Sequence, residues 1–234
     1  MKTFAEKNIY LLLGLFILPQ LLKAQDKFKV SGNIDAVSDY VWRGMDQESG
    51  ASLQPSLDFS FKGFNLSFWG SGSIAELEPQ EFDITLGYSI KGFEISVTDY
   101  WWNGKNAAYG NYKNAHYFEG TLNYYFGEKC PLTLSWSTMF AGGDKDEEGN
   151  RYYSSFFSAS YDIYLPKEII LTPTIGINPY KSQWNEKFNL IEISLKAAKD
   201  IKITEHFSIP LFIQATVSPA CDHTYLVAGF SLGF

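Results

Sequence analysis

Apolar and polar residues alternate along most of this chain after its first 27 residues, and a period of two is typical of β-strands. The clearest case is the last stretch, Thr224 to Phe234, where one face carries mostly apolar side chains and the other small or polar ones. The chain ends with this strand, and an open strand edge needs a partner. We therefore expect it to pair with the first strand, Phe28 to Trp42, and to close the sheet into a barrel.

The alternation predicts twelve strands, including one from Arg151 to Tyr164, with long and short connections in turn. Lys62-Gly63 and Lys91-Gly92 predict tight hairpin turns. An even strand count, with long loops outside and short turns in the periplasm, is typical of bacterial outer-membrane barrels. The predicted fold is thus all-β, a transmembrane antiparallel up-and-down β-barrel with both termini periplasmic. Three prolines fit this pattern poorly, because each removes a ladder hydrogen bond inside an expected strand: Pro55, Pro173 and Pro210.

The first 25 residues have the pattern of a secretory signal peptide. Lys2 and Lys7 precede an apolar run from Ile9 to Leu18, and the small residue Ala24 suits cleavage after residue 24 or 25. The apolar run is too short to span a bilayer, which disfavours a retained anchor. We expect residues 1–25 to be removed and residues 26–234 to form one outer-membrane barrel, since no linker divides them.

Charge and composition narrow the partners. The chain has 19 basic and 26 acidic residues, and removal of Lys2, Lys7, Lys23 and Glu6 leaves a net charge of −9, which argues against nucleic acid. Aromatic residues reach 17%, although no apolar run after the leader approaches the length of a membrane helix. This combination favours a β-barrel in which alternate residues meet lipid. We expect export to the outer membrane of a two-membrane bacterium.

Aromatic residues collect near both ends of the expected strands, as they do in the interfacial girdles of outer-membrane barrels. The candidates are Trp42, Phe61, Phe64, Phe93, Trp102, Phe126, Phe140 and Phe234. The alternative is a secreted β-sandwich or lipocalin-like barrel, in which the apolar face would fill the interior. The expected topology places Cys130 and Cys221 at opposite ends of the barrel, beyond the reach of a disulfide.

One segment resembles a known family. The segment Ser38-Asp39-Tyr40-Val41-Trp42-Arg43-Gly44 is similar to the start of the outer-membrane porins labelled TorF, and the similarity continues at Gln47, Pro55, Phe59, Gly63-Phe64 and Phe68-Trp69. The resemblance is sharpest over residues 36–70 and implies a signal peptide, a single barrel and passive passage of solutes. The final Phe234 resembles the C-terminal signal by which the barrel-assembly machinery recognises such barrels.

The inward face of the expected strands supplies the candidate functional residues. Acids outnumber bases among the pore-lining candidates: Asp35, Asp39, Arg43, Asp58, Asp83, Glu94, Glu119, Asp162, Glu192 and Lys196. Asp39 and Arg43, four apart on the first strand, are expected to line a constriction or to brace the rim. We expect a porin for small hydrophilic solutes with a weak cation preference. The alternative is a plugged structural or surface-binding barrel without conductance.

Other chemistry has little support. Asp144-x-Asp146-x-Glu148-Gly149 copies the start of a calcium loop, but Ser155 stands where the bidentate Glu is needed. His116, His206 and His223 have no metal-ligand spacing, and no Gly-x-Ser-x-Gly elbow is present. An outer-membrane phospholipase would need a serine beside an outward histidine, and His116 has no obvious one. We therefore expect no enzymatic activity, no metal and no cofactor, with membrane lipid and small solutes as partners.

Overall fold

The computed structural model describes residues 28–75, 79–102, 108–205 and 207–233. The expected signal peptide and Phe234 lie outside the described residues. Among the residues described, no helix combines the length and the apolar character needed to cross a membrane.

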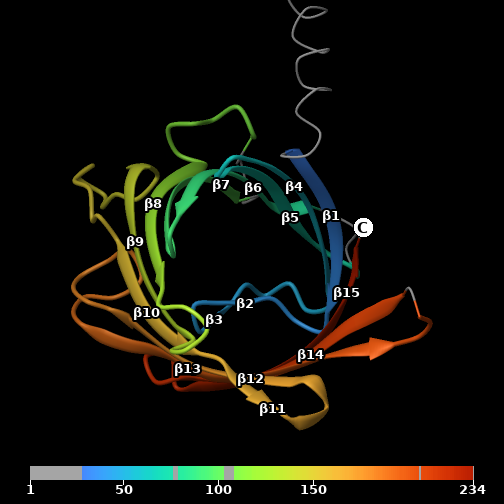
Figure 1. Ribbon diagram of the computed structural model, residues 1–234. Helices are drawn as coiled ribbons and strands as arrows, with labels where there is room; N and C mark the ends of the chain where they lie inside the picture. The colour runs from blue at the N-terminus through green and yellow to red at the C-terminus, as the bar shows by residue number, and fades with distance from the viewer. Residues whose placement is uncertain (1–27, 76–78, 103–107, 206, 234) are drawn as a thin grey trace, which may run out of the picture.

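The strands form a closed, twelve-strand antiparallel barrel, as the alternation predicted. Its wall runs in the order β10-β9-β8-β7-β6-β5-β4-β1-β15-β14-β13-β12, and β10 pairs with β12 to close it, with the short β11 continuing β10 along β12. A separate two-stranded hairpin, β2 and β3, lies inside the ring of strands (Figure 1). The bounds are β1 Phe28–Val37, β2 Val41–Trp42, β3 Met45–Asp46, β4 Ser52–Phe61, β5 Phe64–Ser73, β6 Pro79–Ile90, β7 Phe93–Trp102, β8 His116–Tyr125, β9 Leu132–Gly142, β10 Ser155–Tyr161, β11 Ile163–Leu165, the single-turn helix η1 Pro166–Glu168, β12 Ile169–Asn178, β13 Asn189–Lys202, β14 Ser208–Ser218 and β15 His223–Gly233.

The first and last strands pair directly, which confirms the expected closure. Their register places Asn33 opposite Gly233 and Val37 opposite Gly229. On the inward face, the Ser231 hydroxyl donates a hydrogen bond of 2.5 Å to Asp35. The edge of the terminal strand is therefore paired along the part of β1 nearest the long loops, and the sheet has no free edge there.

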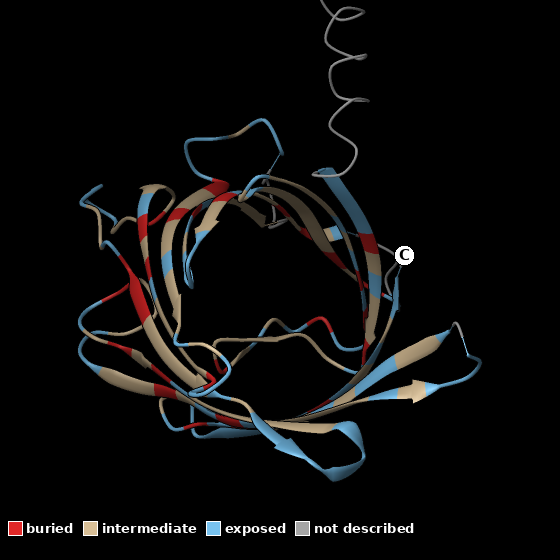
Figure 2. Cartoon of the chain, in the orientation of Figure 1, coloured by how far each residue is buried: buried red, intermediate tan, exposed pale blue. Residues whose placement is uncertain are grey.

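Burial in this barrel is the reverse of burial in a soluble protein. Outward apolar side chains such as Leu86, Ile95 and Leu226 are about 60% exposed or more, while serines, threonines and carboxyls dominate the buried positions. Those buried positions are spread around the wall and the crossing segment rather than gathered in a central core (Figure 2). This distribution contradicts the lipocalin-like alternative, which needs an apolar interior.

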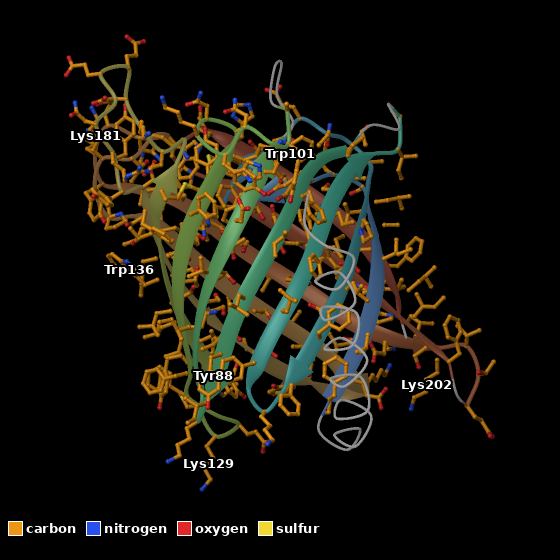
Figure 3. The ribbon with its side chains drawn as sticks, turned by 90° about the horizontal axis from the view of Figure 1, so that it is seen from above. Tyr88, Trp101, Lys129, Trp136, Lys181 and Lys202 are labelled. Carbon is orange, nitrogen blue, oxygen red and sulfur yellow. The ribbon has the colours of Figure 1, made fainter. Side chains whose placement is uncertain are left out.

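The two ends of the barrel differ in the way that the sequence predicted. Seen from the side, Tyr88 and Lys129 mark the end with short turns, and Trp101 and Lys181 mark the end with long loops (Figure 3). At the short-turn end, outward rings touch in the pairs Phe64–Tyr88 and Phe93–Tyr124, with centroids 4.8 and 4.2 Å apart. Four girdle candidates are largely exposed on the outer face: Phe64, Phe93, Phe126 and Phe140. Phe61 is partly exposed beside Phe64.

Each unexpected proline lies where pairing to one neighbour is interrupted. The β4–β5 register skips from Leu53 to Ser56 around Pro55. Pro173 falls between the residues of β12 that pair with β11 and those that pair with β10. Pro210 comes just before Leu211, where the pairing of β14 with β15 begins. A missing backbone N–H costs little at such interruptions, so the strands tolerate all three residues.

Two expected strand boundaries are wrong. The strand expected from Arg151 begins only at Ser155, because Ser154 is held in the preceding loop by Asp144. It is also interrupted at Asp162, between β10 and β11. The first strand, expected to reach Trp42, ends at Val37. Cys130 and Cys221 are both free and exposed, as expected, in connections at opposite ends of the barrel.

Candidate functional site

The polypeptide leaves the barrel wall at Ser38 and turns into the lumen. The Ser38 backbone N–H donates to the Ala228 carbonyl at 2.8 Å, and the Ser38 hydroxyl accepts from the Ala228 N–H at 2.9 Å. These two hydrogen bonds attach Ser38 to the last strand, β15, at the point where the chain leaves the wall. The chain returns to the wall at Ser52, which lies opposite Val37 in the β1–β4 register. Residues 38–51 therefore form an inserted loop, which we call the luminal hairpin.

The tip of the luminal hairpin reaches the opposite wall. Arg43 and Gly44 adopt φ angles of +50° and +71°, the left-handed backbone of a type I′ turn between β2 and β3. A Cβ atom on Gly44 would collide with the carbonyl oxygen of Ile191 on β13. Only glycine allows the tip to approach the wall this closely, because both the φ angle and the space exclude a side chain.

Gly44 can be tested against Gly50, which also has a positive φ but would carry a Cβ atom with no neighbouring atom within 4 Å. Gly44→Ala should displace the hairpin tip, whereas Gly50→Ala should cost only the left-handed strain of roughly 1–2 kcal/mol. The readout is thiol labelling of Val41→Cys in a Cys130→Ser, Cys221→Ser background. Faster labelling with Gly44→Ala alone is expected, and equal rates in both variants would contradict the close packing of the tip.

Arg43 binds the barrel wall through a bidentate ion pair with Glu119 on β8. Its two terminal nitrogens lie 2.7 and 2.8 Å from the two carboxylate oxygens. Glu119 is 1% exposed, and it also accepts a hydrogen bond from the Tyr100 hydroxyl at 3.0 Å. The guanidinium lies between two rings, 4.3 Å from the centroid of Trp42 and 4.6 Å from that of Phe156. Burial acts to lower the pKa of Arg43, but Glu119 raises it overall, so the guanidinium stays charged.

Aromatic rings attach the rest of the hairpin to the wall. Trp42 packs edge-on against Trp102 at 5.8 Å and Trp184 at 5.6 Å, and Tyr40 packs against Trp69 at 5.5 Å. Trp42 and Trp102 were expected in a membrane girdle, and both expectations are wrong. Trp42 lies in the lumen because the strand ends before it, and Trp102 points inward, stacked on the inward Tyr100.

Asp39 and Arg43 do not share a strand face, contrary to expectation, because both belong to the luminal hairpin. Asp39 lines a cavity of about 220 Å³ between the hairpin and the wall, together with Asp35 and Lys196. Desolvation raises the pKa of Asp39, and the carboxylate of Asp46 raises it further. The hairpin thus brings some of the predicted pore-lining residues into this cavity and others into contact with Glu119.

The remaining pore-lining candidates are spread along the inward face and held by polar neighbours. Asp58 accepts from the Ser67 hydroxyl at 2.5 Å, and Asp162 accepts from Thr172 at 2.7 Å. Glu94 accepts from Asn123 at 3.2 Å, and Glu192 from Ser194 at 2.7 Å. These carboxylates give the lumen a negative lining rather than forming one compact site.

Glu81, which was not among the predicted pore-lining residues, lies beside Asp83 on the inward face of β6. The two residues are 4% and 8% exposed, and their carboxyl groups interact directly. Glu81 also interacts with Tyr40 of the hairpin and with Trp102. The spacing of two between Glu81 and Asp83 places both residues on one face of β6 and would have identified Glu81.

His116 holds the loop that contains Tyr109 and Tyr112 against the outer wall. One ring nitrogen lies 2.7 Å from the Asp99 carboxylate, and the other bonds to the Tyr109 carbonyl at 2.5 Å. Tyr112 stacks on the ring at 3.9 Å. Both nitrogens are therefore engaged, which leaves neither for activating a serine.

The acidic loop likewise forms a turn of its own. Asp144 is fully buried and bonds to the Ser154 hydroxyl and backbone N–H, while Asp146 accepts from the backbone N–H groups of Glu148 and Asn150. Asp144 is therefore used inside the protein rather than presented as a calcium ligand. Across the described ranges, no three His, Cys, Asp or Glu side chains are grouped so that they could hold a metal ion.

Together, the wall and the inserted loop define a class of protein: a closed β-barrel with an apolar outer face and a polar lumen crossed by a hairpin. The chain belongs to the family described as bacterial protein of unknown function (Gcw_chp), whose model matches residues 22–212. The matched region includes the whole luminal hairpin and its wall partners Glu119 and Ile191, whereas Ala228 on β15 lies outside it. No curated protein matches the chain.

Proposed function

We propose that this protein is an outer-membrane porin that lets small hydrophilic solutes diffuse through a lumen narrowed by the luminal hairpin. The observation that carries the proposal is the inverted burial of the barrel: exposed apolar side chains outside, buried polar side chains inside. An apolar outer face over the full circumference is stable against lipid and costly against water. A polar lining replaces part of the hydration of a passing solute.

The resemblance to TorF porins supports the same proposal. Its characteristic residues, Asp39, Tyr40, Arg43 and Gly44, all lie in the luminal hairpin, where they would meet a solute. We further propose that the leader directs export, that Phe234 serves recognition by the barrel-assembly machinery, and that the outer face contacts outer-membrane lipid. We assign the protein no catalytic role.

The charge of the lumen predicts a weak preference for cations. Arg43 is neutralised by Glu119, and Lys196 lies beside Asp35 and Asp39. The other inward carboxylates therefore give the lumen its net negative charge. Reversal potentials of the refolded protein in planar bilayers under a KCl gradient should shift toward the potassium potential. A shift toward the chloride potential would contradict this assignment of the lining.

A second candidate is a plugged barrel with a structural or surface-binding role. The ion pair between Arg43 and Glu119, with the two side chains 11% and 1% exposed, favours it because such a contact resists opening. Liposome swelling separates the two candidates. Swelling by small sugars and amino acids supports the porin, and absence of both swelling and conductance in correctly folded protein supports the plug.

A further inference from the structure

The most unusual group in the lumen is the pair of carboxyls on β6. Glu81 and Asp83 are both more than nine-tenths buried, and one carboxylate oxygen of Asp83, Oδ1, is buried without a hydrogen-bond partner among the described residues. A buried carboxyl oxygen without a partner is costly. Two adjacent buried carboxyls are costlier still, unless they share a proton or bind a cation.

No base of the hairpin is free to neutralise the pair. Arg43, the guanidinium that the hairpin brings nearest to this wall, is already bidentate to Glu119. Glu119 is itself close enough to Asp83 to add to the negative field there. This part of the lumen thus holds the buried carboxyls of Glu81, Asp83 and Glu119 but only one guanidinium, which pairs with Glu119. One further positive charge can therefore be accommodated beside Glu81 and Asp83.

The surroundings of the pair are aromatic. In the sheet register Asp83 lies between Trp69 on β5 and Tyr100 on β7, and Glu81 lies opposite Trp102. Tyr40 of the hairpin reaches the same place, against Trp69 and Glu81. Trp69 and Trp102 lie on the inward face of their strands and are partly exposed. Carboxyls at the base of a wall of aromatic rings are the arrangement that binds organic ammonium ions, through charge and cation–π attraction.

The same surroundings argue against a metal ion. Hard divalent cations require six or more oxygen ligands, and the described part of the chain contains no cluster of three or more metal-ligating side chains. Aromatic faces, by contrast, suit a weakly hydrated cation that carries methyl or methylene groups.

We propose that Glu81, Asp83, Trp69, Tyr100, Trp102 and Tyr40 form a binding subsite for a small organic ammonium ion. The inference deepens the proposed function, since it rests on solutes entering this lumen and names the class that the constriction selects. Asp83 supplies the charge, the indole rings of Trp69 and Trp102 supply the faces, and Tyr40 makes the subsite depend on the inserted hairpin.

The test uses choline as the probe and its uncharged isostere, 3,3-dimethylbutan-1-ol, as the matched ligand. Isothermal titration of the refolded full barrel in detergent should show saturable binding of choline and none of the alcohol. Asp83→Asn should weaken choline binding about tenfold or more, a change of about 1.4 kcal/mol. Asp58→Asn is the control, because Asp58 faces the same lumen but lies between Ser31 and Ser67 instead of aromatic residues.

Trp69→Leu is a second variant, which keeps every charge. It should weaken the binding of choline without changing the preference for potassium measured by reversal potential. Equal affinity of Asp83→Asn and Asp58→Asn, or equal binding of choline and the alcohol by the unaltered protein, would overturn the subsite. The titration needs no conduction, so the two proposals fail separately. Conductance without choline binding removes the subsite only, and choline binding without conductance removes the porin only.

Discussion

Excision of the luminal hairpin should raise single-channel conductance several-fold. The hairpin crosses from β1 to β13 and carries the rings of Tyr40 and Trp42 into the lumen, so its removal widens the lumen at that level. The wall should survive, because Val37 and Ser52 are directly opposite in the β1–β4 register. Replacing residues 39–48 with a Gly-Ser linker of about four residues therefore joins two strands that are already paired.

The excision needs a charge correction, since loss of Arg43 leaves Glu119 buried and unpaired. The variant should therefore also carry Glu119→Gln. Deletion of residues 147–149 from the exposed acidic loop serves as the matched control for loop shortening. Planar-bilayer recordings should show a large increase for the first variant and little change for the second. Unchanged conductance after excision, with heat-modifiable migration showing a folded barrel, would mean that the hairpin does not set the resistance of the lumen.

The barrel wall was predictable because its signal is local. Alternation with a period of two assigns each residue to a face without knowledge of its neighbours, and the paired Lys-Gly turns at residues 62–63 and 91–92 fix the hairpins. Closure also followed, since an even number of strands and an edge at the chain end leave β15 to pair with β1. What local pattern cannot give is the end of a strand when alternation continues past it.

The luminal hairpin was missed for that reason. Asp39, Tyr40, Trp42 and Arg43 continue the alternation of β1, but the backbone reverses at Arg43, whose left-handed φ is rare for arginine. Only the following Gly44 signals a turn, and its reason is a contact with β13, far away in sequence. Long-range contacts of this kind fix the site but leave no periodic trace in the chain.

Two other errors could have been avoided from the sequence. Strict parity along β7, from the outward Phe93, Ile95 and Val97, places Trp102 inward, where the structure has it. Strict parity along β6 likewise places Glu81 with Asp83. In both cases the period of two decides the face, because these strands extend as far as the residue concerned.

Breaking one side of the Arg43–Glu119 pair should be the most damaging single change in the lumen. Glu119→Gln leaves a guanidinium without its counter-charge, and Arg43→Met leaves a carboxylate at 1% exposure. Loss of one partner from a buried pair costs about 3–5 kcal/mol. The double variant Arg43→Met, Glu119→Gln removes both charges, so its cost should fall short of the sum of the single costs by about 1 kcal/mol or more.

Urea unfolding of the refolded barrel, followed by tryptophan fluorescence, gives the change in unfolding free energy for each single variant and for the double variant. The hairpin can also expose an unpaired charge to water by leaving the lumen. The measured loss of unfolding free energy then cannot exceed the free energy needed to move the hairpin out of the lumen. Labelling of Val41→Cys detects that escape, because the half-buried Val41 becomes more accessible when the hairpin leaves the lumen. Both single variants should label faster than the double variant. Additive free energies together with equal labelling rates would mean that the ion pair does not hold the hairpin, and that the aromatic contacts of Tyr40 and Trp42 hold it instead.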